Sequence, residues 1–140
     1  MARGYPDFEG DKKGLSQEPG WAAFEATDRN FSLISANLAW EDDDTSDYVV
    51  PAGSTLYITS LTFAAYASLA ADANNNQHAE VCLQNHTTFA THVSLGGNGG
   101  NSINLSKPIV IPGGQTFRLY VESKANHTIR IWATAHGYEV

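Results

Sequence analysis

The stretch VIPGGQTFRLYVE, residues 110–122, decides the fold of this chain. Behind its proline and glycines, apolar and polar side chains alternate, and a period of two indicates a β-strand with one buried face. The expected inward set is Phe117, Leu119 and Val121, and the expected outward set is Arg118, Tyr120 and Glu122. Residues 127–135 alternate in the same way, with Ile129, Ile131 and Ala133 inward and Arg130, Trp132 and Thr134 outward.

An internal repeat extends this pattern to the first half of the chain. VVPAGSTLYI, residues 49–58, matches VIPGGQTFRL, residues 110–119. Proline fixes φ near about −65°, and a glycine two residues later permits positive φ, so each copy predicts a tight corner between a short and a long strand. Two such corners, one in each half, are typical of two Greek keys folded into a jelly roll.

The rest of the chain also has the pattern of strands, and no segment has a convincing helical period. We therefore expect an all-β fold, an antiparallel jelly-roll-like β-sandwich over residues 21–140, preceded by an extended N-terminal arm over residues 1–20. The further strand candidates are 21–27 (weak), 31–40, 48–50, 55–68, 78–84, 88–95, 103–105 and 109–111, with a glycine-rich tip at 96–100.

Residues 1–20 contain four glycines, two prolines and charges of both signs, which is the composition of a segment without its own core. Its three large apolar side chains, Tyr5, Phe8 and Leu15, are spaced too irregularly for one face of a helix or strand. We expect these three residues to bind pockets of a neighbouring subunit as anchors.

The strand candidate 55–68 is apolar on both parities, which predicts either a central strand of a sandwich or a strand that lines a subunit interface. The outward aromatics Trp132 and Tyr120 also need cover, and we expect both to bind a partner. These features favour a homo-oligomer, most simply a homotrimer. Outward rings, including Tyr57, also stack on sugars, and alternation alone does not choose between these uses.

Charge excludes two classes of partner. Eight Lys and Arg face 15 Asp and Glu, for a net charge of −7. Nucleic-acid binders need a basic face, and anionic membranes attract basic segments, so we expect neither nucleic acid nor membrane as a partner.

No catalytic motif is present, and we expect no enzyme activity, no catalytic residue and no cofactor. The five histidines lack zinc-like spacing, and Asp72-x-Asn74-x-Asn76 lacks the later ligands of a calcium loop, so no metal site is expected there. The acidic cluster at 41–47 favours a solvated loop, with a structural Ca²⁺ as the alternative. Cys82 lies in an apolar run and is expected to be a buried thiol.

Three segments resemble small virion proteins of tailed bacteriophages: MARGYPDF (residues 1–8), VPAGSTLYI (residues 50–58) and HGYEV (residues 136–140). The strand pattern after the arm also resembles the jelly-roll modules of capsid decoration proteins. The resemblance implies a small β-sandwich in the phage particle, often trimeric, and carries over no catalytic residue.

The sequence thus predicts a structural protein located in the virion, at the capsid surface. The expected function is that of a capsid decoration or cement protein, with the major capsid protein or another virion protein as partner. The alternative is a receptor- or carbohydrate-binding tip module of a fibre or tail, with surface aromatics as its platform.

Overall fold

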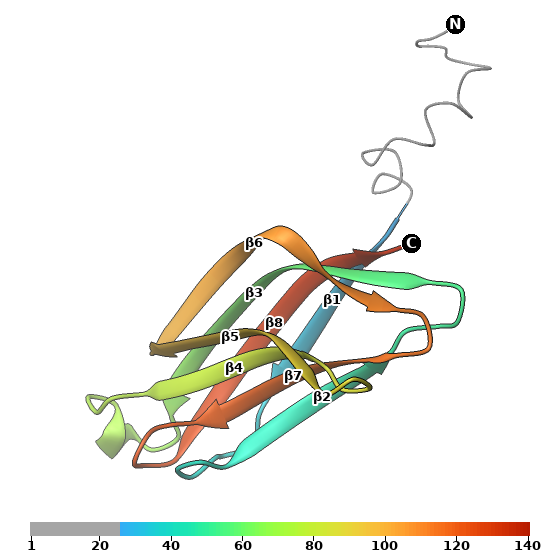
Figure 1. Ribbon diagram of the computed structural model, residues 1–140. Helices are drawn as coiled ribbons and strands as arrows, with labels where there is room; N and C mark the ends of the chain where they lie inside the picture. Colours follow the sequence, from blue (N-terminus) through green and yellow to red (C-terminus); the bar gives the residue numbers. More distant parts are fainter. Residues whose placement is uncertain (1–25) are drawn as a thin grey trace, which may run out of the picture.

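The computed structural model describes residues 26–140 (Figure 1). These residues form eight strands and one short 3-10 turn, and no α-helix. The elements are β1 (Thr27–Ile34), β2 (Asp43–Val49), β3 (Thr55–Ala67), η1 (Ala70–Asp72), β4 (His78–Asn85), β5 (Ala90–Asn98), β6 (Gly100–Pro112), β7 (Thr116–Ser123) and β8 (Ile129–Glu139). The predicted arm, residues 1–20, and residues 21–25 of the predicted body lie outside the described residues.

The eight strands form two antiparallel four-stranded sheets, with orders β1-β8-β3-β6 and β2-β7-β4-β5. The hydrogen-bonded pairs are nested, since β1 pairs with β8, β2 with β7, β3 with β6 and β4 with β5. A long hairpin rolled up on itself gives this order, which is that of a jelly roll. The predicted fold class is confirmed.

The two Pro-x-Gly corners carry the chain between the sheets. Gly53 has φ +85° and Gly114 has φ +83°, as the repeat predicted. The turns close through Ser54 N donating to Pro51 O (3.0 Å) and Gln115 N donating to Pro112 O (3.2 Å). The corners also meet, because Gly114 N donates to Val50 O at 2.7 Å. The repeat therefore marks the place where two of the chain's crossings between the sheets, β2 to β3 and β6 to β7, pack together.

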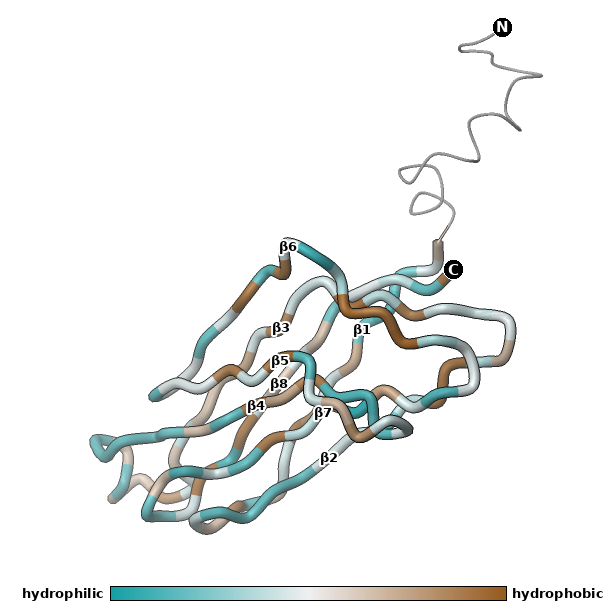
Figure 2. Tube along the Cα trace, viewed as in Figure 1, coloured by the Kyte–Doolittle hydropathy of each residue, from teal (hydrophilic) through white to brown (hydrophobic). Residues whose placement is uncertain are grey.

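The core lies between the sheets and uses the alternation found in the sequence. Every inward residue expected on β7 and β8 is buried, and so is Cys82. Figure 2 shows hydrophilic residues gathered at the loops and along β2, and hydrophobic segments recurring along the inner strands. The largest fully buried side chains are Phe117, Leu56, Ile58, Leu61, Leu83, Ile111, Leu119, Ile129, Ile131, Val50, Val81 and Val121.

A β-bulge corrects the interpretation of strand 55–68 as apolar on two faces. The register of β3 shifts between Ile58 and Ser60 against both of its neighbours. Against β8, Thr59 is an extra residue of β3, whereas against β6 the unpaired residues are 105–108 of β6. Side-chain parity changes there. Leu56 and Ile58 before the bulge, and Leu61 and Phe63 after it, consequently all point into the core. The apolar pattern of β3 on both parities is therefore no evidence for a subunit interface.

The predicted bounds of two strands were wrong. One strand is shorter than predicted, and two predicted short strands form a single long one. β1 ends at Ile34 rather than at residue 40, since the Ser35 hydroxyl, and not a carbonyl, accepts the hydrogen bond from Ile131 N (2.9 Å). Residues 103–105 and 109–111 belong to the single strand β6, because this edge strand tolerates Pro108.

Two predicted loops also turned out differently. The acidic cluster is not a loop beyond Asp42, since β2 begins at Asp43 and forms a sheet edge. Charged edge strands discourage pairing with another chain, which gives these carboxylates a role in a strand. At 96–100, β5 runs to Asn98, and only Gly99, at φ +82°, turns the chain into β6 of the other sheet.

The open side of the sandwich is held by a polar cluster between the sheets. Tyr48 on β2 donates its hydroxyl to Glu139 Oε1 on β8 at 2.7 Å, and Arg29 on β1 lies 3.4 Å from the same oxygen. Phe31 packs between these groups and the core, with ring centroids 5.0 Å from Tyr48 and 5.1 Å from Phe117. We call Arg29, Tyr48 and Glu139 the inter-sheet clasp.

Candidate functional site

The three aromatics expected to point outward have different surroundings. Tyr57 on β3 stacks on Tyr138 of β8, with centroids 4.9 Å apart and planes 14° apart. Tyr120 on β7 is half-buried and donates its hydroxyl to Glu122 Oε1 at 2.7 Å. Trp132 on β8 keeps 53% of its surface exposed. Of these three rings, only Trp132 is widely open to a partner.

Trp132 and Tyr120 lie on different sheets. β8 belongs to the β1-β8-β3-β6 sheet and β7 to the other one, and both side chains point away from the core between them. The two predicted partner-binding residues are therefore on opposite faces of the sandwich. One flat contact does not cover both of them.

The outer side of the β1-β8-β3-β6 sheet carries two uncharged rows that include Trp132, and Arg130 lies in the row beside them. In register, Ile34, Trp132, Ala64 and Gly100 form one row across the four strands, and Ser32, Thr134, Thr62 and Ser102 form the next. We call these two rows the Trp132 face. Cross-strand neighbours on one face of a sheet lie in contact distance, so the apolar row and the hydroxyl row form one continuous surface.

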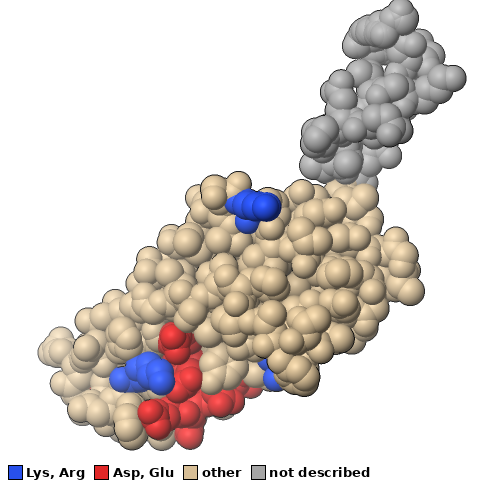
Figure 3. Space-filling model, in the orientation of Figure 1, with Lys and Arg blue, Asp and Glu red and all other residues tan. Residues whose placement is uncertain are grey.

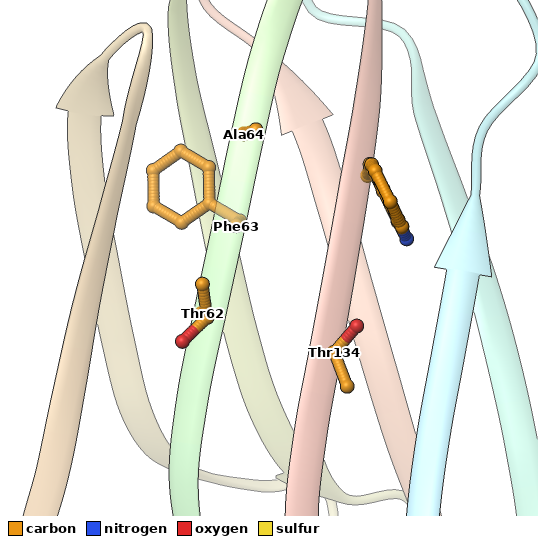
Figure 4. Close-up of a pocket in the computed structure, with 5 residues that line it drawn as sticks. Thr62, Phe63, Ala64 and Thr134 are labelled. Atoms are coloured by element: carbon orange, nitrogen blue, oxygen red, sulfur yellow. The ribbon is translucent and has the colours of Figure 1, made fainter.

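A shallow hollow lies in the middle of this face. Its lining consists of Thr62, Phe63, Ala64, Trp132 and Thr134, and its volume is about 210 Å³. Figure 4 shows Thr62 and Ala64 on one strand and Thr134 on the neighbouring strand around the opening. We call it the Trp132 hollow. Pockets that enclose a whole small ligand measure about 300–1,000 Å³, so this hollow has room for one ring of a larger partner.

The opposite sheet presents a charged surface instead. Asp43, Glu122 and Glu80 lie side by side on β2, β7 and β4. Lys124 Nζ lies 2.7 Å from Glu122 Oε2 and holds the pKa of that carboxyl below its usual value. In Figure 3 acidic side chains gather toward one end of this side of the molecule. We call the row Asp43, Glu80 and Glu122 the acidic face.

The same sheet also carries an ion pair between β2 and β7, beside the acidic face. Arg118 bonds Asp47 through two hydrogen bonds of 2.6 and 2.7 Å, which lower the pKa of Asp47. Burial and the bond to Glu122 raise the pKa of Tyr120. Since Tyr120 is already engaged, the structure does not favour it as an anchor.

The remaining sequence-based expectations concern the N-terminal residues, Cys82, metal ligands and membrane-spanning helices. Tyr5, Phe8 and Leu15 lie outside the described residues. Burial is the main cause of the raised pKa of the Cys82 thiol, which bonds Ser94 Oγ at 3.6 Å. Within residues 26–140 no group of three or more His, Cys, Asp or Glu gathers as metal ligands do. No helix among those residues is long and apolar enough to cross a membrane.

One histidine belongs to a structural network. His127 Nε2 donates to Gln77 Oε1 at 2.7 Å, and the Gln77 amide donates to the carbonyls of Asp72 and Asn75 at 2.8 Å. Gln77 is buried, so its side chain fixes the loop that follows η1. The Asp72-x-Asn74-x-Asn76 motif lies in this loop.

Two exposed apolar residues of interest were missed by sequence reasoning. Ile34 is the last residue of β1 and pairs with Trp132. Its position was not recognised from the sequence, because residues 31–40 were interpreted as one strand. Phe89 is 83% exposed in the hairpin between β4 and β5, where the sequence pattern predicted a strand from residue 88. Thr87 and Thr88 before it are turn-forming polar residues and were the available signal.

Comparisons with known proteins add only distant structural likenesses. No protein-family model matches the chain, and no curated protein matches it. Dimeric latent PorU from Porphyromonas gingivalis is similar over 81% of this chain and 13% of that chain, at 10% identity and a TM-score of 0.46. The chain thus spans a small part of that protein.

Two further solved structures are similar at 10% identity. The decameric BFDV capsid protein matches over 81% of this chain and 95% of that chain with a TM-score of 0.32. The Yersinia pseudotuberculosis-derived mitogen matches over 69% and 86% with a TM-score of 0.24. Likenesses this distant carry no functional argument, and the jelly-roll assignment rests on the strand order of the chain itself.

Proposed function

We propose that this protein is a structural protein of a phage particle, a decoration protein of the capsid surface. Its copies associate through the Trp132 face, as a homotrimer, and residues 1–20 attach the assembly to the major capsid protein or another virion protein. The resemblance of three segments to phage virion proteins supports the location, and the jelly roll is a frequent fold of capsid proteins.

The observation that carries the proposal is the difference between the two outer surfaces. The Trp132 face has no ionisable side chain in its two rows, whereas the acidic face places three carboxylates in one row. Interface centres are depleted in charged residues and enriched in aromatic ones. In a chain of net charge −7, the Trp132 face is the surface suited to contact another protein.

The place where residues 1–25 join the body favours a role for this segment together with the Trp132 face. β1 is an edge strand of the same sheet, and its first residue, Thr27, pairs with Glu139 near the C-terminus (Figure 1). The segment 1–25 therefore joins the body at the sheet that carries Trp132. Burial of Tyr5, Phe8 and Leu15 in a neighbour would contribute about 1.5–3 kcal/mol each before the cost of ordering the backbone.

Binding to particles that lack the protein tests the attachment. Replacement of Tyr5 and Phe8 together by Ala is expected to weaken docking strongly while the body stays folded and oligomeric. Sedimentation of particles with bound protein measures docking, and analytical ultracentrifugation of the free variant is the control. Docking equal to wild type by the double variant would contradict the proposed role of residues 1–20.

A second candidate function, carbohydrate binding at a fibre or tail tip, is favoured by the composition of the Trp132 hollow. An exposed indole beside the hydroxyls of Thr62 and Thr134 is a surface suited to a neutral sugar ring. The two functions differ in the residues they need. A sugar-binding module keeps its ligand after deletion of residues 1–20 and loses it on Trp132→Ala, as binding to immobilised neutral glycans would measure.

A further inference from the structure

Phe89 has a backbone conformation that opposes its side chain. It is the fifth residue of the turn that begins at Asn85, and its φ is +58°. Only glycine, and to a smaller extent Asn and Asp, adopt this region readily, and a bulky residue there is a clear outlier. The ring gains almost no burial in return, since 83% of the residue is exposed. Local strain without a packing gain is a feature of functional positions.

The turn that holds Phe89 is well supported. Asn85 is buried, its side-chain oxygen accepts from Thr87 N and Thr88 N at 3.0 and 3.2 Å, and its amide donates to Gln115 Oε1 at 2.6 Å. Thr116 N donates to Thr87 Oγ1 at 2.9 Å, which ties the turn to β7. The His86 ring packs edge-on against Phe89 with centroids 5.4 Å apart. A ring presented on such a framework loses little freedom on binding.

The distribution of charge indicates which surface of another copy the Phe89 ring can contact. Two chains of net charge −7 repel each other wherever carboxylates approach, which disfavours the acidic face as a contact. The segment 85–90 contains no acid, and the Trp132 hollow has no ionisable residue in its lining. The hollow, of about 210 Å³, is open beside an indole and has room for one aromatic ring. Ring pairs are favourable beyond their buried area.

We propose that Phe89 of one copy inserts into the Trp132 hollow of the next copy, between Thr62, Ala64 and Trp132. The proposal rests on the proposed self-association but not on attachment to a capsid. The hairpin tip and the hollow are different places on one chain, so the contact is heterologous, and repetition of it builds a closed ring such as a trimer when the rotation closes.

Complementary variants of the full chain test this contact. Phe89→Asn removes the ring, and Ala64→Arg fills the hollow with a charged side chain. Each variant alone is expected to sediment as a monomer at concentrations where the wild type is a trimer. An equimolar mixture is expected to form a dimer, because the Ala64→Arg chain keeps an intact Phe89 and the Phe89→Asn chain keeps an intact hollow.

Two controls separate this contact from misfolding and from general stickiness. Asn accepts positive φ, so Phe89→Asn is expected to raise the melting temperature while it abolishes association. Leu69→Asn removes another apolar side chain, 62% exposed on a different loop, and is expected to leave the trimer intact. Far-UV circular dichroism of each variant reports folding.

The outcomes are distinguishable. A trimeric wild type whose state is unchanged by Phe89→Asn and by Ala64→Arg would overturn the pairing and leave self-association standing. A monomeric wild type at micromolar concentration would overturn both. Two monomeric variants that do not combine in the mixture would show that Phe89 and the hollow do not bind each other.

Discussion

At the scale of single residues, close backbone approach decides the most sensitive positions. Gly137 on β8 lies opposite the bulge of β3, and a β-carbon there would fall 2.0 Å from the carbonyl oxygen of Tyr57. The two strands would have to separate to accommodate it. The bulge that directs the apolar residues of β3 inward therefore depends on a glycine in the neighbouring strand.

Replacement of Gly137 by Ala is expected to destabilise the fold by about 1–3 kcal/mol, the usual cost of overpacking. Gly96→Ala on β5 is the matched control, because its β-carbon would meet only atoms at 3.7 and 3.9 Å. Urea denaturation of both variants measures the difference. Equal midpoints for the two would contradict the close approach at Gly137.

The inter-sheet clasp makes a second prediction, which depends on pH. The bond to Glu139 is the first cause of the raised pKa of Tyr48. A group whose pKa is raised by folding stabilises the fold fully below its unfolded pKa, about 10 for Tyr, and loses this contribution as pH rises through the folded pKa. Tyr48→Phe is expected to cost about 1–3 kcal/mol at neutral pH, because buried Glu139 loses its closest donor.

The difference in unfolding free energy between wild type and Tyr48→Phe is therefore expected to stay constant up to about pH 10 and to shrink above it. Denaturation series across this range, with Tyr66→Phe as an exposed control, measure it. A difference that grows with alkaline pH would have the wrong sign for this cluster.

At the scale of elements, alternation was the part of the fold that could be predicted. β7 and β8 were predicted with their inward and outward residues, because a period of two follows directly from strand geometry. The corner glycines were predicted because positive φ has few solutions in sequence. The bulge in β3 and the extent of β6 were not, since both depend on pairing with distant strands.

Leu119 on β7 tests the predicted inward set. It is fully buried, and Leu119→Ala is expected to cost about 2–5 kcal/mol through lost burial and the remaining cavity. Ser102→Ala on β6, at an exposed position, is expected to change stability by less than about 0.5 kcal/mol. Guanidinium denaturation compares the two. A cost for Leu119→Ala as small as that control would mean that the alternation was misinterpreted.

Deletion of Thr59 tests the bulge. Without this residue the register against β8 becomes regular, and Leu56, Ile58, Leu61 and Phe63 all fall on one parity. We therefore expect the deletion variant to remain folded, with its near-ultraviolet dichroism retained. Deletion of Thr62 keeps the bulge but turns the buried residues that follow it outward, and is expected to leave the chain unfolded or molten. A Thr59 deletion variant as disrupted as the Thr62 deletion variant would contradict the role of Thr59 as the extra residue.

At the scale of the whole molecule, the candidate site was predicted only in part. Trp132 was found from alternation alone, but Tyr120 was assigned to the same role although its sheet faces the other way. The parity of a residue in a strand shows that its side chain points outward, but it does not show which of the two sheets contains that strand. Ile34 and Ala64 were not predicted because their place beside Trp132 depends on the cross-strand register. Phe89 was not predicted because its exposure depends on the conformation of one turn.

The proposed place of the protein, as a decoration protein at the capsid surface, is tested by electron micrographs of phage particles assembled with the protein, which is labelled by a specific antibody fragment. We expect label over the outer surface of the capsid, and loss of that label from particles that carry the Tyr5→Ala, Phe8→Ala variant. Label confined to the tail or to fibre tips would contradict this location and favour the carbohydrate-binding module, and unlabelled particles would contradict a place in the virion.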